Sequence, residues 1–92
     1  MITITLEARG TLAEVFGPET CYELADGATL GDLLDRIDRE HGERLAQTIW
    51  NRRERRFRGP VVIMAGQRAV KDRATPLGDR QVVSLYKALV GG

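Results

Sequence analysis

The residues best suited to chemistry in this sequence are the last two, Gly91 and Gly92. Glycine has no Cβ, so an extended diglycine fits a channel too narrow for other residues and leaves its terminal carbonyl open to attack. We expect Gly92 to carry a free α-carboxylate and Gly91 to give a partner access to it. A carboxylate is a poor electrophile, so its use requires activation, most simply to an acyl-adenylate made with ATP. Attack by sulfur or an amine would then give a thiocarboxylate, a thioester or an amide.

The segment before the diglycine predicts a strand that leads into a flexible tail. Residues 82–86 include β-branched and aromatic side chains, which are typical of strands. We expect the tail to cover residues 88–92, which could span roughly 17 Å when extended. Strand alternation cannot bury all the apolar residues here, so we predict that four of them dock partners: Leu85, Tyr86, Leu89 and Val90. The alternatives are that the last two fold back on the sheet, and that the glycines are a frayed end.

The rest of the chain offers no recognisable catalytic residue or metal site. His41 and Cys21 are the single histidine and the single cysteine, and no motif surrounds either of them. We expect His41 at a helix end or on the surface, and Cys21 as a buried, inert thiol in a strand. The glycines match no nucleotide fingerprint, so we expect no bound cofactor.

The strongest charge cluster covers residues 52–58, which contain five arginines and Phe57. Arginines next to an aromatic ring are typical of single-stranded RNA binding. The formal net charge is only +1, however, and no recognition motif accompanies the run. We therefore favour a solvated loop or a partner-docking patch over contact with nucleic acid.

Length and composition predict one domain over residues 1–92. Hydrophobic content of 42% and charged content of 29% are those of an ordinary soluble globule. A single cysteine excludes an internal disulfide and agrees with a reducing compartment. Residues 1–7 alternate in polarity, which predicts neither a signal peptide nor a membrane span. We therefore expect a cytoplasmic protein.

The first half of the chain predicts two strands and one long helix. Residues 2–7 alternate apolar and polar side chains, so one face of this strand should be buried. A turn-rich connection should lead to an antiparallel strand over residues 20–24. Thr29 and Asp32 predict a capped helix start, and the following apolar residues recur at helical spacing. We expect this helix to end near His41, with Gly42 in the left-handed conformation.

The second half predicts mostly strands. Residues 43–51 could form a second short helix, and the apolar run 61–65 suggests a strand covered on both faces. Residues 68–70 suggest a short edge strand, and Gly78-Asp79 a tight turn into the last strand. This order suits an α+β fold in which the first and last strands pair in parallel at the centre of a mixed sheet. It predicts a β-grasp, ubiquitin-like fold with one main helix packed across one face.

In this order and spacing the sequence resembles the MoaD/ThiS family of ubiquitin-like sulfur carriers. The resemblance covers nearly the whole chain and rests on residues 27–34 (GATLGDLL), 75–79 (TPLGD) and 90–92 (VGG). It implies a protein that is not an enzyme and binds no cofactor, whose Gly92 is adenylated by an E1-like enzyme that uses ATP. A sulfur donor would then convert the adenylate to a thiocarboxylate, which a biosynthetic enzyme would accept.

The resemblance leaves the receiving pathway open. The chain has Met64-Ala65-Gly66 where family members often have Val-Asn-Gly, and Lys87-Ala88-Leu89 where they often have Pro-Pro-Val. Residues 43–59 form a longer stretch than in thiamine-type carriers and resemble cysteine-biosynthetic or other specialised carriers. The sulfur could serve molybdopterin, cysteine, thiamine or another metabolite. The same tail also fits a ubiquitin-like modifier joined to lysines through Gly92, or a subunit that lends its tail to a larger enzyme.

Overall fold

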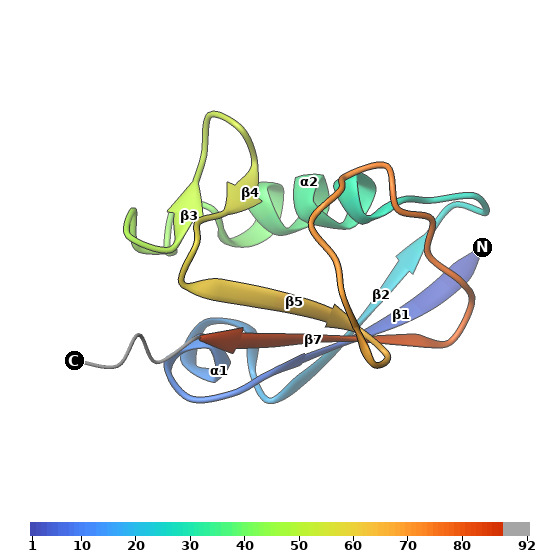
Figure 1. Cartoon of the computed structure of the whole chain (residues 1–92), viewed down its shortest axis with the longest axis horizontal. Coiled ribbons are helices and arrows are strands. Elements are labelled where there is room, and N and C mark those ends of the chain that lie inside the picture. Colours follow the sequence, from blue (N-terminus) through green and yellow to red (C-terminus); the bar gives the residue numbers. More distant parts are fainter. Residues whose placement is uncertain (88–92) are drawn as a thin grey trace.

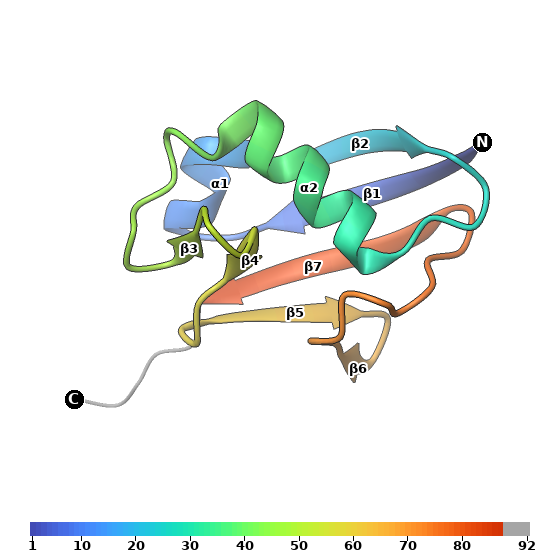
Figure 2. The ribbon, with the colours of Figure 1, turned by 90° about the horizontal axis from the view of Figure 1, so that it is seen from above.

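The structure is a computed structural model that describes residues 1–87. The predicted tail over residues 88–92 therefore lies outside the described residues. The described chain forms a five-stranded mixed sheet with one long helix across one face (Figure 1 and Figure 2). In chain order the elements are β1 (Ile2–Ala8), α1 (Thr11–Phe16), β2 (Glu19–Leu24), α2 (Leu30–His41), β3 (Trp50–Asn51), β4 (Arg56–Phe57), β5 (Val61–Ala65), β6 (Arg68–Ala69) and β7 (Gln81–Lys87).

The first and last strands pair in parallel at the centre of the sheet, as the sequence predicts. The strand order is β2-β1-β7-β5-β6, and the register of β1 and β7 runs from Ile4 opposite Gln81 to Ala8 opposite Leu85. β2 pairs antiparallel with β1 on one side, and β5 pairs antiparallel with β7 on the other. The predicted α+β, β-grasp fold is therefore confirmed.

The core lies between the sheet and α2, and the helix contributes the predicted apolar stripe. Leu30, Leu33, Leu34 and Ile37 are all at most 2% exposed. Residues three and four apart lie on one side of a helix, so this spacing places all four against the sheet. The turn-rich connection after β1 contains the short helix α1, which also contributes buried side chains to the core.

The start of α2 is held both by its own cap and by the loop that precedes β7. The Thr29 side chain accepts a hydrogen bond from the Asp32 amide, and the Asp32 carboxylate accepts one from the Thr29 amide, which forms the predicted capping box. The free amides of Leu30 and Gly31 donate to the carbonyls of Thr75 and Arg73, each at 2.8 Å. The loop over residues 71–76 is thereby fixed to the helix on its way to β7.

Glycine is needed at position 31 because the loop comes so close. A Cβ on Gly31 would lie 3.0 Å from the Arg73 carbonyl oxygen. The Arg73 guanidinium also donates to the Asp35 carboxylate at 2.7 Å and to the Gly31 carbonyl at 3.2 Å. These contacts tie the loop to the first turns of α2 from both backbone and side chain.

The predicted second helix over residues 43–51 is wrong. This stretch consists of turns that lead into a two-stranded ribbon, in which Trp50 of β3 faces Phe57 of β4. Trp50 is 1% exposed, and its Nε1–H donates to the Asp38 carboxylate at 2.9 Å. The Trp50 and Phe57 rings pack edge to face with centroids 4.7 Å apart. Contacts with residues distant in sequence therefore override the weak helical spacing.

The predicted left-handed conformation of Gly42 is also wrong. Gly42 has φ −53° and ψ −36°, which is right-handed helical backbone that any residue can adopt. Space explains the glycine instead, because a Cβ here would lie 2.5 Å from the Asp38 Oδ1 atom. That carboxylate is the acceptor for Trp50, so a side chain at position 42 would disturb the anchor of the β3–β4 ribbon.

Removing the cap of α2 should destabilise the whole domain. We expect Thr29→Ala to lower the free energy of unfolding by about 1 kcal/mol, because the Asp32 amide loses its acceptor. Urea unfolding followed by circular dichroism measures the change. Thr48→Ala is the matched control, since Thr48 is exposed in a turn, and should change stability by less than about 0.5 kcal/mol. Equal effects of the two substitutions would contradict the importance of the cap.

His41 should make stability depend on pH. Partial burial, helped by the nearby Arg44 charge, lowers the pKa of His41 below its ordinary value of 6.5. The unfolded chain therefore takes up a proton before the folded protein does, so stability should fall as the pH drops from about 6.5 through the lower folded pKa. Proton NMR titration of this single histidine measures the pKa directly. His41→Gln should remove this share of the pH dependence, and a folded-state pKa at or above 6.5 would refute the prediction.

Candidate functional site

The described part of the candidate site is the end of β7, from which the chain continues into residues 88–92. Lys87 lies opposite Val61 of β5, while Leu85 lies between Ala8 of β1 and Ile63 of β5. A strand paired on both sides holds its position better than an edge strand does. The start of the predicted tail is therefore anchored in the middle of the sheet.

Leu85 does not fit the predicted docking role, because it belongs to the core. Its side chain is 1% exposed and faces α2 together with Val83. Neighbouring residues of a strand face opposite sides of the sheet, so Tyr86 faces outward and is 38% exposed. Of the four residues predicted to dock partners, Tyr86 is therefore the one that the described surface presents. Leu89 and Val90, like Gly91 and Gly92, lie outside the described residues.

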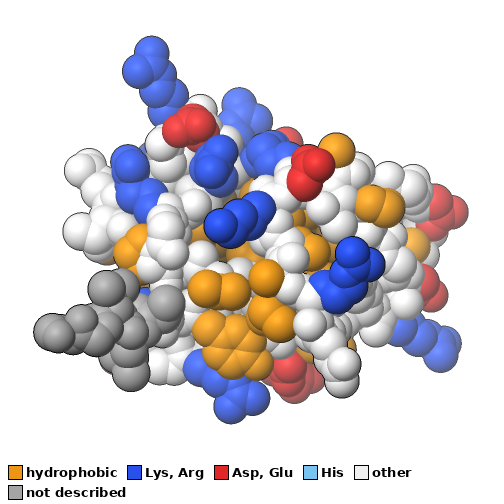
Figure 3. Space-filling model, viewed as in Figure 1, with side chains coloured by type: hydrophobic (Ala, Val, Ile, Leu, Met, Phe, Trp, Pro, Cys, Tyr) orange, Lys and Arg blue, Asp and Glu red, His pale blue; other side chains and the backbone are white. Residues whose placement is uncertain are grey.

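Tyr86 belongs to an apolar patch on the sheet face opposite α2. We call this the outer-face patch and define it as Val62, Met64, Val82 and Tyr86. Val62 lies directly opposite Tyr86 in the register, and Val82 is 41% exposed. Figure 3 shows hydrophobic side chains gathered over β5 and β7. The predicted strand over 61–65 is confirmed, but its coverage on both faces is wrong, since Val62 and Met64 are only half-buried.

Two cationic residues lie at the end of β7, and one of them, Arg9, adjoins the outer-face patch. The Arg9 guanidinium lies 5.9 Å from the centroid of the Tyr86 ring, in the geometry of a cation–π contact. Lys87 is exposed and is the last residue before the tail. Positive charge here favours the approach of anionic groups, including a carboxylate or a phosphate.

Cys21 is exposed, which corrects its prediction as a buried thiol. In β2 the alternate residues Tyr22 and Leu24 occupy the core side, so Cys21 faces outward. Its Sγ atom lies 3.9 Å from the Thr5 Oγ1 atom, on the polar side of the outer sheet face. His41 lies at the end of α2 as expected, where Phe16 packs against its ring at 5.0 Å between centroids.

The residues that the structure describes contain no group of three or more His, Cys, Asp or Glu side chains that could hold a metal ion. Among the same residues no helix is long and apolar enough to cross a bilayer.

The arginine run forms the hairpin between β3 and β4, and carboxylates lie next to several of its charges. Arg52 lies 3.4 Å from Asp38, Arg55 lies 3.5 Å from Asp35, and Arg56 lies 3.8 Å from Glu54. Neighbouring carboxylates reduce the net potential that an RNA backbone would meet. A solvated or partner-docking role for the run stays a prediction.

Comparisons with known proteins agree with this geometry at the level of the fold. The sequence matches no protein-family model, and no curated protein matches it. SAMP1 from Haloferax volcanii superposes with a TM-score of 0.77 at 18% identity, over 98% of this chain and 99% of that one. A putative molybdopterin converting factor subunit 1 from Pyrococcus furiosus gives 0.73 at 19% identity, over 97% and 100%.

The chain has a MoaD/ThiS-like ubiquitin fold. The HVO 2177 protein of H. volcanii shares it with a TM-score of 0.76 at 25% identity, over 99% of this chain and 87% of that one. Of the outer-face patch, Tyr86 was predicted from the sequence as a docking residue, whereas Val62, Met64 and Val82 were not. Strict alternation along β7 was the available signal, because Val83 and Leu85 on one side imply Val82 and Tyr86 on the other.

Adjacent residues of β7 should respond very differently to truncation. We expect Leu85→Ala to lower the free energy of unfolding by about 2–5 kcal/mol, because it leaves a cavity between the sheet and α2. Tyr86→Ala should cost less than about 1 kcal/mol, since it removes only an exposed ring and its contact with Arg9. Urea unfolding of both variants measures the difference. Similar losses would show that the assignment of the two faces is wrong.

Proposed function

We propose that this protein is a sulfur carrier whose Gly92 carboxylate is activated by an E1-like enzyme and converted to a thiocarboxylate. The observation that supports it most is the position of β7. This strand is central in a ubiquitin-like sheet, and it ends at Lys87, with three residues between it and the diglycine. A carrier needs a firm scaffold and a short side-chain-free terminus, and β7 supplies the scaffold.

The chemistry follows from the requirements of a carboxylate. In the E1-like enzyme a Gly92 carboxylate oxygen attacks the α-phosphorus of ATP, which forms an acyl-adenylate and releases pyrophosphate. Sulfide attacks the carbonyl carbon and displaces AMP to give the thiocarboxylate directly. A persulfide on a donor protein instead displaces AMP to form an acyl disulfide, and a thiol then attacks the donor's sulfur to release the thiocarboxylate. The resulting thiocarboxylate is the nucleophile offered to an acceptor enzyme. In this scheme Gly91 provides room in the partner's channel, while ATP binds to the activating enzyme.

The outer-face patch, with Arg9 beside it and Lys87 at the end of β7, provides the docking surface for these partners. Tyr86 is exposed next to the start of the tail, and Val82 is exposed on the same face four residues earlier, so a partner that binds both also holds the tail near its active site. Arg9 and Lys87 can contact acidic groups at the rim of such a partner. Leu89 and Val90 would extend the contact into the tail. The acceptor belongs to the synthesis of molybdopterin, cysteine, thiamine or another sulfur-containing metabolite.

The second candidate is a ubiquitin-like modifier, in which a substrate lysine attacks the Gly92 adenylate or a derived thioester. It is favoured by the two neighbouring structures from H. volcanii described as SAMP1 and small archaeal modifier protein 1. A third is a subunit that lends its tail to a fixed larger enzyme, which the neighbour described as a molybdopterin converting factor subunit favours. Carriage, conjugation and fixed assembly use the same terminus but leave different products.

Intact mass measurement tests sulfur carriage. The protein is incubated with an E1-like enzyme, ATP and a sulfide or persulfide source. We expect a mass increase equal to the exchange of one oxygen for sulfur, located on the C-terminal peptide. A variant lacking Gly91 and Gly92 is the matched control and should show no change. The absence of any increase in the full chain, with an activating enzyme that adenylates it, would overturn the proposal.

Immunoblotting of cell extract separates the candidates. A single band agrees with carriage, and a ladder that resists reductant supports conjugation through Gly92. An enzyme that co-purifies in fixed proportion would favour the larger complex.

A further inference from the structure

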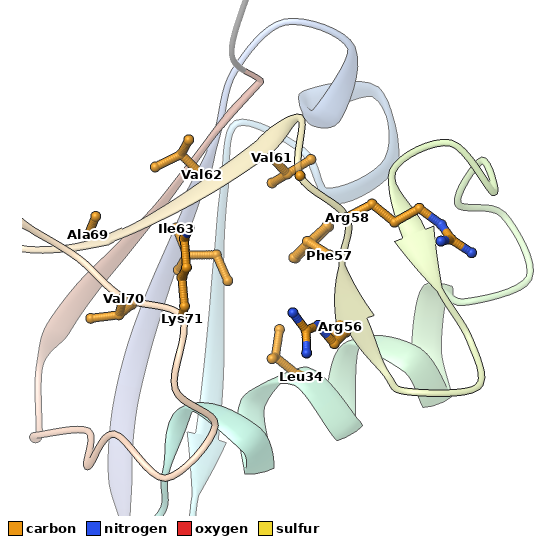
Figure 4. Close-up of a pocket in the computed structure, with 11 residues that line it drawn as sticks. Leu34, Arg56, Phe57, Arg58, Val61, Val62, Ile63, Ala69, Val70 and Lys71 are labelled. Atoms are coloured by element: carbon orange, nitrogen blue, oxygen red, sulfur yellow. The ribbon is translucent and has the colours of Figure 1, made fainter.

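A second surface lies along the edge of β5 that faces away from β7. A groove of about 190 Å³ runs between this edge, the β4 strand, α2 and the chain after β6 (Figure 4). Leu34 and Phe57 line the side of the groove toward the helix, and Ile63 points into it from the strand. The side chains of Val62 and Ala69 also line the groove but lie on the opposite face of the sheet from Ile63. The groove therefore follows the strand edge itself.

The backbone of this edge is only partly paired. β6 pairs with β5 at Met64 and Ala65, and the Val70 amide donates to the Ile63 carbonyl at 2.9 Å. Further along the same edge the Val61 amide donates to the Arg58 carbonyl at 3.0 Å. The Ile63 N–H and the Val61 carbonyl face the same way, because backbone groups of every second strand residue share a side. Neither has a backbone partner among residues 1–87. An extended peptide could pair with both groups.

The charged side chains that line the groove are all cationic. Arg56, Arg58 and Lys71 line it, and no Asp or Glu among the described residues does. The Arg58 Nε–H donates to the Gln47 carbonyl at 2.7 Å, which directs this side chain toward β3. Arg56 approaches Glu54 only at 3.8 Å, and Lys71 forms no ion pair within the described chain. Arg56 and Lys71 are therefore available to an anionic ligand.

We propose that the β5 edge binds an extended peptide segment of a partner protein that carries both acidic and apolar side chains. The segment adds to the sheet as a strand through the Ile63 N–H and the Val61 carbonyl. Its acidic side chains pair with Arg56 and Lys71, and its apolar side chains pack on the lining of the groove. Charge selects the occupant, because a basic segment would place like charges against both cations.

This surface is independent of the proposed sulfur chemistry. β5 uses its other edge to pair with β7, so a peptide on the open edge leaves the start of the tail free. One partner could therefore be held at the groove while another acts on the C-terminus.

Peptide titration of the full-length, ¹⁵N-labelled protein tests the proposal. The probe is acetyl-EVEVE-amide, and acetyl-KVKVK-amide is its charge-reversed counterpart. We expect the acidic probe to shift the amide signals of residues 61–63 and to slow hydrogen exchange of the Ile63 amide, and the basic probe to do neither. Methylation of the peptide nitrogen that would bond to the Val61 carbonyl should abolish binding. Methylation of the next nitrogen, which points away from β5, should not.

Two charge-reversal variants provide the matched control. Lys71→Glu should weaken binding of the acidic probe about fivefold or more, since an attraction becomes a repulsion. Arg68→Glu carries the same charge change on exposed β6 outside the groove and should alter binding less than about twofold. Equal losses in both variants, equal binding of the two probes, shifts confined to the β7 residues Val82 and Tyr86, or no binding would each overturn the proposal. None of these measurements involves Gly92, so failure of the sulfur chemistry would leave them unchanged.

Discussion

The parallel pairing of β1 with β7 is the constraint on which the rest of the structure depends. It joins residues 4–8 to residues 81–85 across nearly the whole described chain, so it can form only when everything between them is correctly placed. Closing so long a loop costs conformational entropy, which the core beneath α2 must offset. The loop over residues 71–76 helps, because its hydrogen bonds to the start of α2 direct the chain into β7. The position from which the C-terminal residues continue therefore reflects the folding of the entire domain.

The two faces of the sheet differ, because one is buried against α2 and the other is exposed. The face toward α2 holds the buried side chains, including Ile4, Leu6, Val83 and Leu85, all at most 1% exposed. No helix of residues 1–87 lies across the opposite face, and apolar side chains over β5 and β7 are exposed there (Figure 3). Substitutions on this outer face can change partner preference with little effect on the core. A scaffold of this kind can keep its fold at low sequence identity, as the neighbours at 17–25% identity do.

The small formal net charge conceals an uneven distribution of charge over the surface. The formal net charge is +1, and the arginine hairpin is partly neutralised by Asp35, Asp38 and Glu54. Among residues 1–87, cations that form no ion pair are found, among other sites, at two places, the end of β7 (Arg9 and Lys87) and the groove beside β5 (Lys71). Both adjoin apolar residues, and this combination is typical of surfaces that bind protein segments. The two places lie at opposite edges of β5, so they can serve different partners.

Local sequence was sufficient to predict those parts of the fold whose signals come from neighbours in the chain. Thr29 and Asp32 cap a helix by themselves, and alternation in residues 2–7 defines a strand with one buried face, so the order of elements and the β-grasp fold could be derived. Contacts distant in sequence decided the rest. Trp50 joined a ribbon because Phe57 and Asp38 lie beside it, and Gly42 is glycine because Asp38 leaves no room for a Cβ. For the same reason, the sequence-based prediction wrongly buried Cys21 and wrongly exposed Leu85. A strand's pattern shows that adjacent residues face opposite ways, but the sheet and helix packed around it determine which side becomes the core.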